Sequence, residues 1–326
     1  MTRLVLSVLL RLAKAVGVVL AIVLLNFVLI RLAPGDPASV MAGQAGAADE
    51  QFMAQLRAQF GLDKPLPAQA WSYVSGVLQG DLGFSYRQGM PVSELILDRL
   101  PATLLLTGTA FAIALIGGVL MGMVAGLNAG RALDFIVSVV SLLFYATPLF
   151  WVGLMSILLF SVYLDWLPAF GMTQVGARFT GWEYVVDVAR HLVLPATTLG
   201  LFYMAVYARM TRASILEVRD MDYVRTARAM GLPRRRMVRS HILRNALLPI
   251  ITLAGIQAGQ LVGGAILTET VFGWPGIGRL AFDALLQRDY QVLLGVFFVT
   301  SIMVVVFNMI TDLLYRLVDP RIGAAA

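Results

Sequence analysis

Long apolar stretches separated by polar segments dominate this chain. A helix needs about 20 mostly apolar residues to cross the hydrocarbon core of a bilayer, and six stretches of the sequence meet that length. They lie at about 12–30, 102–127, 135–162, 192–211, 246–268 and 292–315. The pattern predicts an all-α, polytopic membrane protein with six transmembrane helices, in which residues 1–326 form a single domain.

The first apolar stretch has the layout of a signal sequence, because Arg3, Arg11 and Lys14 precede an apolar run over 15–30. No cleavage site of the small-x-small kind follows it. We therefore interpret this stretch as a retained signal anchor, which counts as the first span.

Two of the polar segments are long enough to hold structure of their own. In the segment 31–100, apolar residues recur every four positions over 49–60, which predicts a small amphipathic helix. The segment 212–245 predicts two short helices with a break between them. Gly231 suits the C-terminal cap of the first helix, and Pro233 suits the first turn of the second.

Composition supports the membrane interpretation and removes several kinds of site. Hydrophobic residues make up 59% of the chain, charged residues make up 13%, and the mean hydropathy is +0.81. A soluble globule of this size could not bury so much apolar surface. The chain has no cysteine and two histidines, so we expect no disulfide, no thiolate metal site and no histidine-built zinc site.

One short segment carries the net positive charge. Ten arginines lie between Arg209 and Arg244 against three acidic residues, a balance of +7 in a chain of +6. Lys and Arg concentrate on the cytoplasmic side of membrane proteins. With both termini inside, the inner segments hold 16 of the 25 basic residues, and the reverse orientation would reverse this bias. The charges predict an N-in, C-in topology with an extracytoplasmic segment at 31–100 and a cytoplasmic loop at 212–245.

The sequence lacks the motifs of an enzyme or a self-powered pump. A nucleotide-binding P-loop needs a lysine after glycine, but Lys14 and Lys64 follow Ala13 and Asp63. Zinc-protease and serine-hydrolase motifs are missing too, as is the mid-span carboxylate that a proton relay needs. We therefore expect no catalytic residue and no cofactor bound by this chain, with the energy for any transport supplied by another chain.

Polar residues inside the predicted spans are few: Gln257 and Gln260 in the fifth, Asn308 and Asp312 in the sixth. Such groups usually face the bundle interior or a wet cavity. The two glutamines and Asn308 are therefore candidates for the lining of a translocation pathway. Hydrogen bonding between helices, without any substrate, is the open alternative.

Glycines four residues apart form grooves on two of the predicted spans. They are Gly118, Gly122 and Gly126 in the second, and Gly255, Gly259 and Gly263 in the fifth. Such grooves let another helix approach closely. The partner helix could belong to this chain or to another subunit.

The basic loop has two possible roles of its own. It could anchor the chain against anionic lipid, or it could be a docking platform for a soluble partner. The sequence DYVRTARAMGL at 222–232, followed by HILRNALLP at 241–249, resembles the coupling loop of ABC importer permeases. It departs from the generic motif, since Arg225 stands for its Glu and Arg244 for its Pro. It is close to the variant of the dipeptide/oligopeptide/nickel branch.

Other blocks extend the resemblance along nearly the whole chain, each at a predicted span boundary. They are RLAPGDP at 31–37, GDLGFS at 80–85, GGAILTETVFGWPGIGRL at 263–280, RDY at 288–290 and the ending from Asn308 to Arg321. Five blocks in order are specific. The chain resembles the first permease of the pair, which has the large outer segment after its first span.

The resemblance implies a type I ABC importer permease fold in the bacterial cytoplasmic (inner) membrane. Such permeases pair with a second, homologous permease, two cytoplasmic ATP-binding subunits that carry ATP and Mg, and an extracytoplasmic binding protein. It also implies an ATPase-coupling loop formed by Tyr223, Arg225, Thr226, Ala227, Arg228 and Gly231. An outer gate would include Glu269, Trp274, Pro275 and Gly276.

Some roles stay open at this point. Tyr223 and Ala227 could merely pack the loop helices together. The arginines at 234–236 could face lipid rather than an ATPase. The Gly and Pro residues after span five could merely form a turn. Peptide import is the expected function, with nickel or another chelated solute as the alternative cargo. A self-contained ion-coupled carrier and a non-transporting receptor are the alternatives from other classes.

Overall fold

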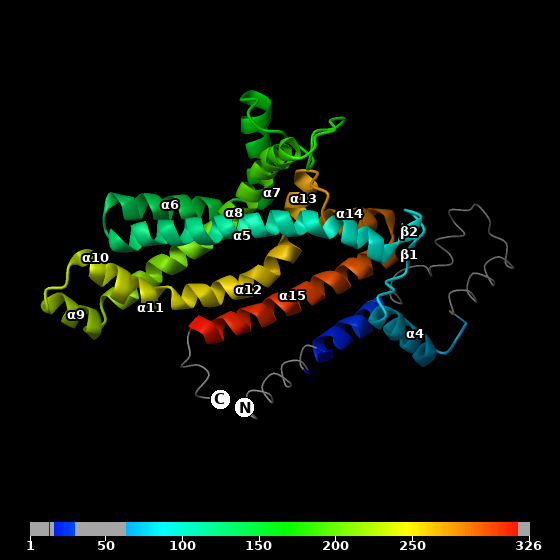
Figure 1. Ribbon diagram of the computed structural model, residues 1–326, viewed down its shortest axis with the longest axis horizontal. Coiled ribbons are helices and arrows are strands. Elements are labelled where there is room, and N and C mark those ends of the chain that lie inside the picture. The colour runs from blue at the N-terminus through cyan, green and yellow to red at the C-terminus, as the bar shows by residue number, and fades with distance from the viewer. Residues whose placement is uncertain (1–12, 14–15, 30–62, 319–326) are drawn as a thin grey trace. The chain divides into compact units, whose positions relative to one another are not determined.

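The computed structural model describes residues 13, 16–29 and 63–318, except for the side chains of 260, 262–264 and 312–318. These residues are mostly helical (Figure 1). They belong to two compact units, one of 1–99 with 280–302 and one of 100–279 with 303–326, and each unit is described by itself. The amphipathic helix predicted over 49–60 lies outside the described residues.

The first unit contains the outer segment of the sequence prediction. Its elements are the helix Val16–Leu29, α4 (Leu66–Leu78), the strands β1 (Phe84–Ser85) and β2 (Met90–Pro91), the beginning of α5 (Val92–Leu127), most of α14 (Ile277–Gln287) and the beginning of α15 (Tyr290–Val318). The two strands form an antiparallel hairpin in which Ser85 lies opposite Met90. The buried Ser85 hydroxyl donates to the carboxylate of Asp289 at 2.5 Å, which fixes the hairpin to the start of α15.

The second unit contains most of the long helices. They are α5 (Val92–Leu127, from residue 100 on), α6 (Ala132–Ala146), α7 (Leu149–Ser156), the π-helix η1 (Ile157–Tyr163), α8 (Trp182–Arg219), α9 (Asp222–Ala229), α10 (Arg234–Met237), the π-helix η2 (Val238–Leu243), α11 (Arg244–Ala246), α12 (Leu248–Gly264), α13 (Ile266–Val271) and the start of α14 (Ile277–Gln287). The end of α15 belongs to this unit too.

Helices occur at all six predicted stretches, but their lengths differ from the prediction. Among the described residues, three helices are long and apolar enough to cross a membrane: Val92–Leu127, Trp182–Arg219 and Tyr290–Thr311. The first of these begins ten residues before the predicted span, and α8 extends past its predicted span at both ends. One bent helix pair, Ala132–Ala146 with Leu149–Tyr163, occupies the predicted third span. A second, Arg234–Ala246 with Leu248–Gly259, covers the end of the predicted loop and the first part of the predicted fifth span. The count of six crossings stays a prediction.

The predicted span 135–162 is not one helix. Between α6 and α7 the chain bends by 102°. Thr147 has an extended conformation, with φ −84° and ψ 133°, and Pro148 follows it as the N-cap of α7. A residue before proline avoids the helical region, and proline has no N–H for the helical hydrogen bond. Thr147 and Pro148 therefore end α6, and α7 leaves in a new direction (Figure 1).

The glycine grooves pack helices of this chain together. A Cβ atom added to Gly118 would lie 2.8 Å from the backbone oxygen of Met204, and one added to Gly122 would lie 2.5 Å from that of Ala208. Thus α5 and α8 are in backbone contact, as small residues permit. Gly255 of α12 likewise meets Thr311 of α15 without room for a Cβ atom. The sequence left open whether the partner helix belongs to this chain or to another subunit. The described glycines of both grooves have their partner helix within this chain.

Candidate functional site

The loop helices, by which we mean α9, α10, η2 and α11, begin later than the sequence analysis predicts. The first loop helix is expected to start near Arg212, but α8 continues without a break to Arg219. The interruption falls at Asp220 and Met221, and α9 begins at Asp222. The apolar residues between 212 and 219, which the sequence analysis assigns to the first loop helix, therefore belong to α8.

Gly231 ends α9 as the sequence predicts. It has a φ of +75°, a conformation that side chains with Cβ atoms rarely adopt. The N–H of Leu232 donates to the carbonyl of Ala227 at 3.2 Å, and that of Gly231 donates to Arg228 at 3.0 Å. These two bonds are those of a Schellman cap. Pro233 follows as the N-cap of α10, so the turn between the two helices is fully defined.

Apolar side chains fasten the loop helices to the end of α8. Val224 of α9 is buried together with Ile215 and Val218 of α8, and Met237 and Ile242 join the same cluster. Ala227 is also buried, at 2% exposure. The side of α9 that carries Val224 and Ala227 therefore faces the chain itself. Ala227, which the resemblance assigns to the coupling residues, is not on the accessible surface of the loop.

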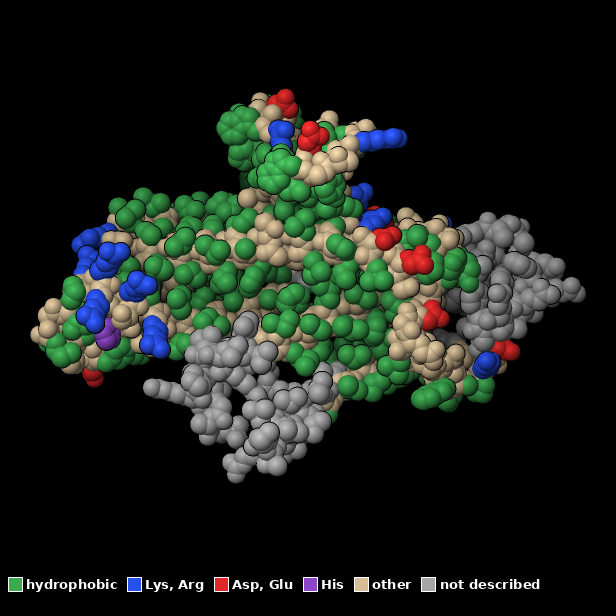
Figure 2. Space-filling view, in the orientation of Figure 1, with side chains coloured by type: hydrophobic (Ala, Val, Ile, Leu, Met, Phe, Trp, Pro, Cys, Tyr) green, Lys and Arg blue, Asp and Glu red, His purple; other side chains and the backbone are tan. Residues whose placement is uncertain are grey.

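The opposite side of α9 is exposed. It carries Tyr223, Arg225, Thr226 and Arg228, and Gly231 is exposed just after it. Tyr223 keeps 39% of its surface exposed, while its hydroxyl accepts a hydrogen bond from Asn245 at 2.8 Å. Figure 2 shows basic side chains gathered over this end of the molecule. The exposed arginines of the loop helices and their connections are Arg225, Arg228, Arg234, Arg235, Arg236, Arg239 and Arg244.

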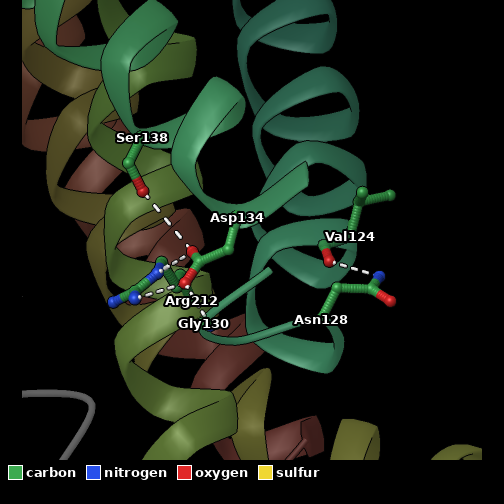
Figure 3. Close-up of polar contacts among 6 residues, drawn as sticks. All are labelled: Val124, Asn128, Gly130, Asp134, Ser138 and Arg212. Atoms are coloured by element: carbon green, nitrogen blue, oxygen red, sulfur yellow. Dashed lines mark hydrogen bonds and ion pairs between the residues drawn. The ribbon is translucent and has the colours of Figure 1, made fainter. Parts of the chain in front are cut away.

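An ion pair joins α6 to α8 near the loop helices (Figure 3). Arg212 donates from Nε and Nη2 to the two carboxylate oxygens of Asp134 at 2.5 and 2.8 Å. The N–H of Gly130, which has a φ of +77° in the turn before α6, donates to the same carboxylate at 3.0 Å. Asp134 is 5% exposed. Because the pair is bidentate, it fixes both the distance and the angle between the two helices.

A second polar cluster surrounds the buried carboxylate of Glu269 on α13. Thr103 of α5 donates its hydroxyl to Glu269 at 2.7 Å, and the backbone N–H of Arg279 donates to the other carboxylate oxygen at 2.9 Å. The Thr103 hydroxyl also accepts from the N–H of Ile277 at 2.8 Å. Glu269 is fully buried, so these bonds replace those that water would make.

The turn between α13 and α14 completes this cluster. Trp274 is fully buried and donates from its indole N–H to the carbonyl of Ala102 at 2.8 Å. Gly276 lies against the Glu269 carboxylate with no room for a Cβ atom, while Pro275 is half-buried between Trp274 and Gly276. The predicted gate residues Glu269, Trp274, Pro275 and Gly276 are thus neighbours. We call Thr103, Glu269, Trp274, Gly276, Ile277 and Arg279 the Glu269 node.

The predicted pathway residues are only partly described. Gln257 is half-buried on α12, and its side-chain oxygen is buried without a hydrogen-bond partner in the described part of the chain. Asn308 is exposed on α15. Gln257 and Asn308 lie at similar heights along the packed helices α12 and α15, because Gly255 contacts Thr311 on one side of them and Gly259 contacts Val304 on the other. The side chain of Gln260 lies outside the described part.

Sequence reasoning missed the partners of several polar residues. Thr103 and Glu269 are 166 positions apart, and Asp134 and Arg212 are 78 positions apart, so no local motif connects them. His191 is 7% exposed, and its Nδ1 lies 2.8 Å from the carbonyl oxygen of Asp187. Asp134 itself stands directly before the predicted span 135–162. Its place beside a membrane span is a local sign that it has a partner, but it does not point to Arg212.

Comparison with known proteins identifies the family. A model described as the binding-protein-dependent transport system inner membrane component matches residues 118–324, and a model of the N-terminal part of such membrane components matches 1–107. The chain belongs to this family of ABC importer permeases. It is therefore a multi-pass membrane protein.

Relatives cover nearly its full length. The chain is 41% identical to the dipeptide transport system permease protein DppB of Escherichia coli, with 96% of this chain and 97% of the relative covered. At the same coverage it is 43% identical to the di/tripeptide permease DppB of Pseudomonas aeruginosa and 39% identical to the oligopeptide permease AppB of Bacillus subtilis. The predicted relationship to peptide importer permeases is confirmed.

Solved structures support the fold. A methionine ABC transporter in an inward-facing conformation matches with a TM-score of 0.56 and 20% identity, over 69% of this chain and 96% of that chain. An amino acid ABC transporter matches with a TM-score of 0.51 and 17% identity. The fold is that of an ABC transporter permease.

Proposed function

We propose that this chain is a transmembrane subunit of an ATP-driven, binding-protein-dependent importer that moves di- or oligopeptides across the bacterial cytoplasmic membrane. In this proposal it has six spans, with both termini inside. It pairs with a second permease, two ATP-binding subunits and an extracytoplasmic binding protein. It catalyses no reaction itself, since ATP and Mg are held by the partner subunits. The similarity to peptide permeases along the whole chain supports the cargo class.

The arrangement of α9 is the observation that carries the coupling proposal. One side of the helix is fixed to α8 by Val224 and Ala227, and the other presents Tyr223 and the arginines. A rigid helix of this kind can seat in a groove of a partner, with an aromatic anchor and charged residues around it. Because α8 continues from the loop helices into the membrane, a movement of α9 would be passed along it.

Transport would follow from a shift between two conformations of the complex. ATP binds more tightly to the state in which the ATPases are closed, so it favours that state. Closure of the ATPases would draw the loop helices of this chain toward those of the second permease and open the pathway to the outside. The Glu269 node would act at the outer gate, and Gln257, Gln260 and Asn308 would line the pathway with groups that suit a peptide backbone.

Purification of the chain from native membranes in mild detergent tests the assembly. We expect a second six-span permease and one or two ATP-binding subunits to copurify. Tyr223→Asp should abolish this association, while Tyr184→Asp, an exposed tyrosine near the other end of α8, should not. A chain that purifies alone and transports in liposomes would overturn the importer proposal in favour of a self-contained carrier.

Uptake by the reconstituted complex tests the pathway. Replacing Gln257 and Gln260 by leucine should lower peptide uptake while the complex still assembles. Unchanged uptake would remove these residues from the pathway.

A further inference from the structure

A cavity of about 260 Å³ lies between α6 and α8, beside the ion pair of Asp134 and Arg212. Most of its wall is apolar. The polar side chains that line it are Ser138, Ser141, Tyr145, Arg209 and Arg212. Apolar walls with a few polar groups that can orient a ligand are the usual lining of a ligand-binding pocket.

The cavity carries one positive charge without a carboxylate partner. The charge of Arg212 is balanced by Asp134. Arg209 instead lies over the ring of Tyr145, with its Cζ 4.7 Å from the ring centroid. Within the described residues no carboxylate forms an ion pair with Arg209. A cation–π contact fixes the position of a guanidinium but leaves its N–H groups able to donate at the edges.

A buried hydroxyl provides the second, independent observation. Ser141 is 8% exposed and lines the same cavity. Its Oγ has no hydrogen-bond partner in the described part of the chain. Buried polar atoms of native proteins are almost always hydrogen-bonded, so an atom like this needs an explanation. A ligand oxygen in the cavity would supply the partner.

The guanidinium of Arg209 points away from the loop helices. Side chains lean toward the N-terminus of their helix, and the N-terminus of α8 lies far from the loop. Tyr145, which Arg209 contacts, lies fourteen residues after Arg131, a rise of about 21 Å along α6. By the same rule the ring of Tyr145 leans back toward the N-terminus of α6. With Arg131 at the inner surface, as the proposed topology has it, and a hydrocarbon core about 30 Å thick, the contact lies in the middle part of that core. An arginine near a membrane surface normally extends back to that surface.

This depth favours one kind of anion. Lipid phosphates lie at the membrane surface, whereas a transported molecule passes through the middle of the bilayer. A volume of about 260 Å³ is also below the range of about 300–1,000 Å³ that holds a drug-sized ligand. The cavity therefore suits the end of a molecule rather than a whole one.

We propose that this cavity binds the C-terminal carboxylate of the peptide during its passage, an inference that rests on the proposed import of peptides. Arg209 donates to the carboxylate, which is the geometry that guanidinium groups favour. Ser141 adds a hydrogen bond from its hydroxyl, and Tyr145 holds the guanidinium in position.

The test uses the complete importer in liposomes of neutral phosphatidylcholine. It compares ATP-driven uptake of a dipeptide with that of the same dipeptide amidated at its C-terminus. Arg209→Gln should lower the maximal rate for the free acid on the order of 10-fold, the usual effect of losing a hydrogen bond to a charged group. The amide should lose little, and the half-saturating concentration of loaded binding protein should not change. Arg209→Lys should retain part of the rate, and Arg178→Gln, at an exposed arginine, is the control.

A capture experiment gives a readout that does not depend on the amidated peptide. A benzophenone amino acid in place of Leu142, which lines the cavity, should label with radioactive free-acid dipeptide during turnover. Labelling should persist with Arg178→Gln and disappear with Arg209→Gln. Equal labelling in the two backgrounds would overturn the proposal.

The remaining outcomes separate the competing explanations. If Arg209→Gln slows both peptides equally, Arg209 only stabilises the C-terminal end of α6, where a cation is favourable, and the proposal fails. If the effect appears only in liposomes with anionic phosphatidylglycerol, the anion is a lipid phosphate and the cargo assignment fails. If the wild-type complex takes up no peptide, it is the proposed function that fails.

Discussion

The loop helices and the Glu269 node are both places where helices of this chain are fastened to one another, which we call joints, but different forces hold them. The loop helices are fastened to α8 by an apolar cluster around Val224, and their exposed side is charged. The Glu269 node is fastened by hydrogen bonds to one fully buried carboxylate. Apolar contacts have no preferred direction, whereas buried hydrogen bonds lose their value when the geometry changes.

Because of this difference, we expect the two joints to move in different ways. A joint held by apolar packing can adjust by small movements when a partner seats on it. A joint held by a satisfied polar network has a few discrete arrangements, which is what a gate needs. The two joints should therefore respond differently to substitution: the node should lose stability, and the loop should lose coupling.

The largest effect is expected at the node. Glu269→Leu leaves the donors of Thr103 and Arg279 buried without their acceptor, and each such donor costs roughly 1–3 kcal/mol. We expect a loss of several kcal/mol, visible as a lower Tm of the purified chain in detergent. Glu217→Leu, at an exposed position of α8, is the control. Equal, small shifts of Tm for the two variants would show that the carboxylate does not hold the node together.

The second effect concerns the ion pair between the buried Asp134 and the half-buried Arg212, which joins α6 to α8 near the loop helices. Arg212→Leu leaves the Asp134 carboxylate buried with only Gly130 and Ser138 as donors, so we expect a loss of about 1–3 kcal/mol. Asp134→Leu in addition should restore part of the stability, because no buried charge then remains. A double-mutant cycle of Tm values measures this coupling, and simple additivity would contradict it.

The sequence was informative about the loop and less so about the node. The Schellman cap at Gly231 is local, because its bonds span five residues, and a glycine before Leu-Pro predicts it. The extent of α8 was not predictable from hydropathy, since residues 212–219 are polar enough to be assigned to a separate helix of the loop. In the structure they continue α8 and pack on α9. The acceptor role of Glu269 depends on Thr103, which is 166 residues away. Only tertiary contact can reveal such a pair.

Two glycines with positive φ allow a direct comparison of the loop helices with the hairpin of β1 and β2. Gly231 and Gly89 have φ values of +75° and +70°, and at both positions an added Cβ atom would have no neighbouring atom within 4 Å. Replacement by alanine should cost each about 1 kcal/mol through backbone strain alone. If α9 docks on an ATPase, Gly231→Ala should also lower the peptide taken up per ATP hydrolysed, while Gly89→Ala should not. If both variants took up the same amount of peptide per ATP hydrolysed, this would contradict the proposal that α9 passes a movement of the ATPase along α8.

The smallest effect on stability is expected at Tyr223. Tyr223→Phe removes the hydrogen bond that the hydroxyl accepts from Asn245 and the one of 3.4 Å that it donates to the carbonyl of His241. Both bonds are exposed, so we expect a loss of about 0.5 kcal/mol, the lower end of the range for a hydrogen bond. The ring itself remains, so association with the ATPase subunits should persist, whereas Tyr223→Asp should abolish it. Thr252→Val removes an exposed hydroxyl bond of α12, outside the loop helices, and is the matched control.

These three variants separate an aromatic anchor from a hydrogen-bonded brace. An anchor works through the area of its ring, so it tolerates the loss of the hydroxyl and fails when the ring is replaced by a charge. A brace works through its bond to Asn245, so it fails in both cases. Copurification of the ATPase subunits with each variant measures the difference. If Tyr223→Phe loses them as completely as Tyr223→Asp while Thr252→Val keeps them, Tyr223 positions α11 against α9 and does not contact the partner through its ring.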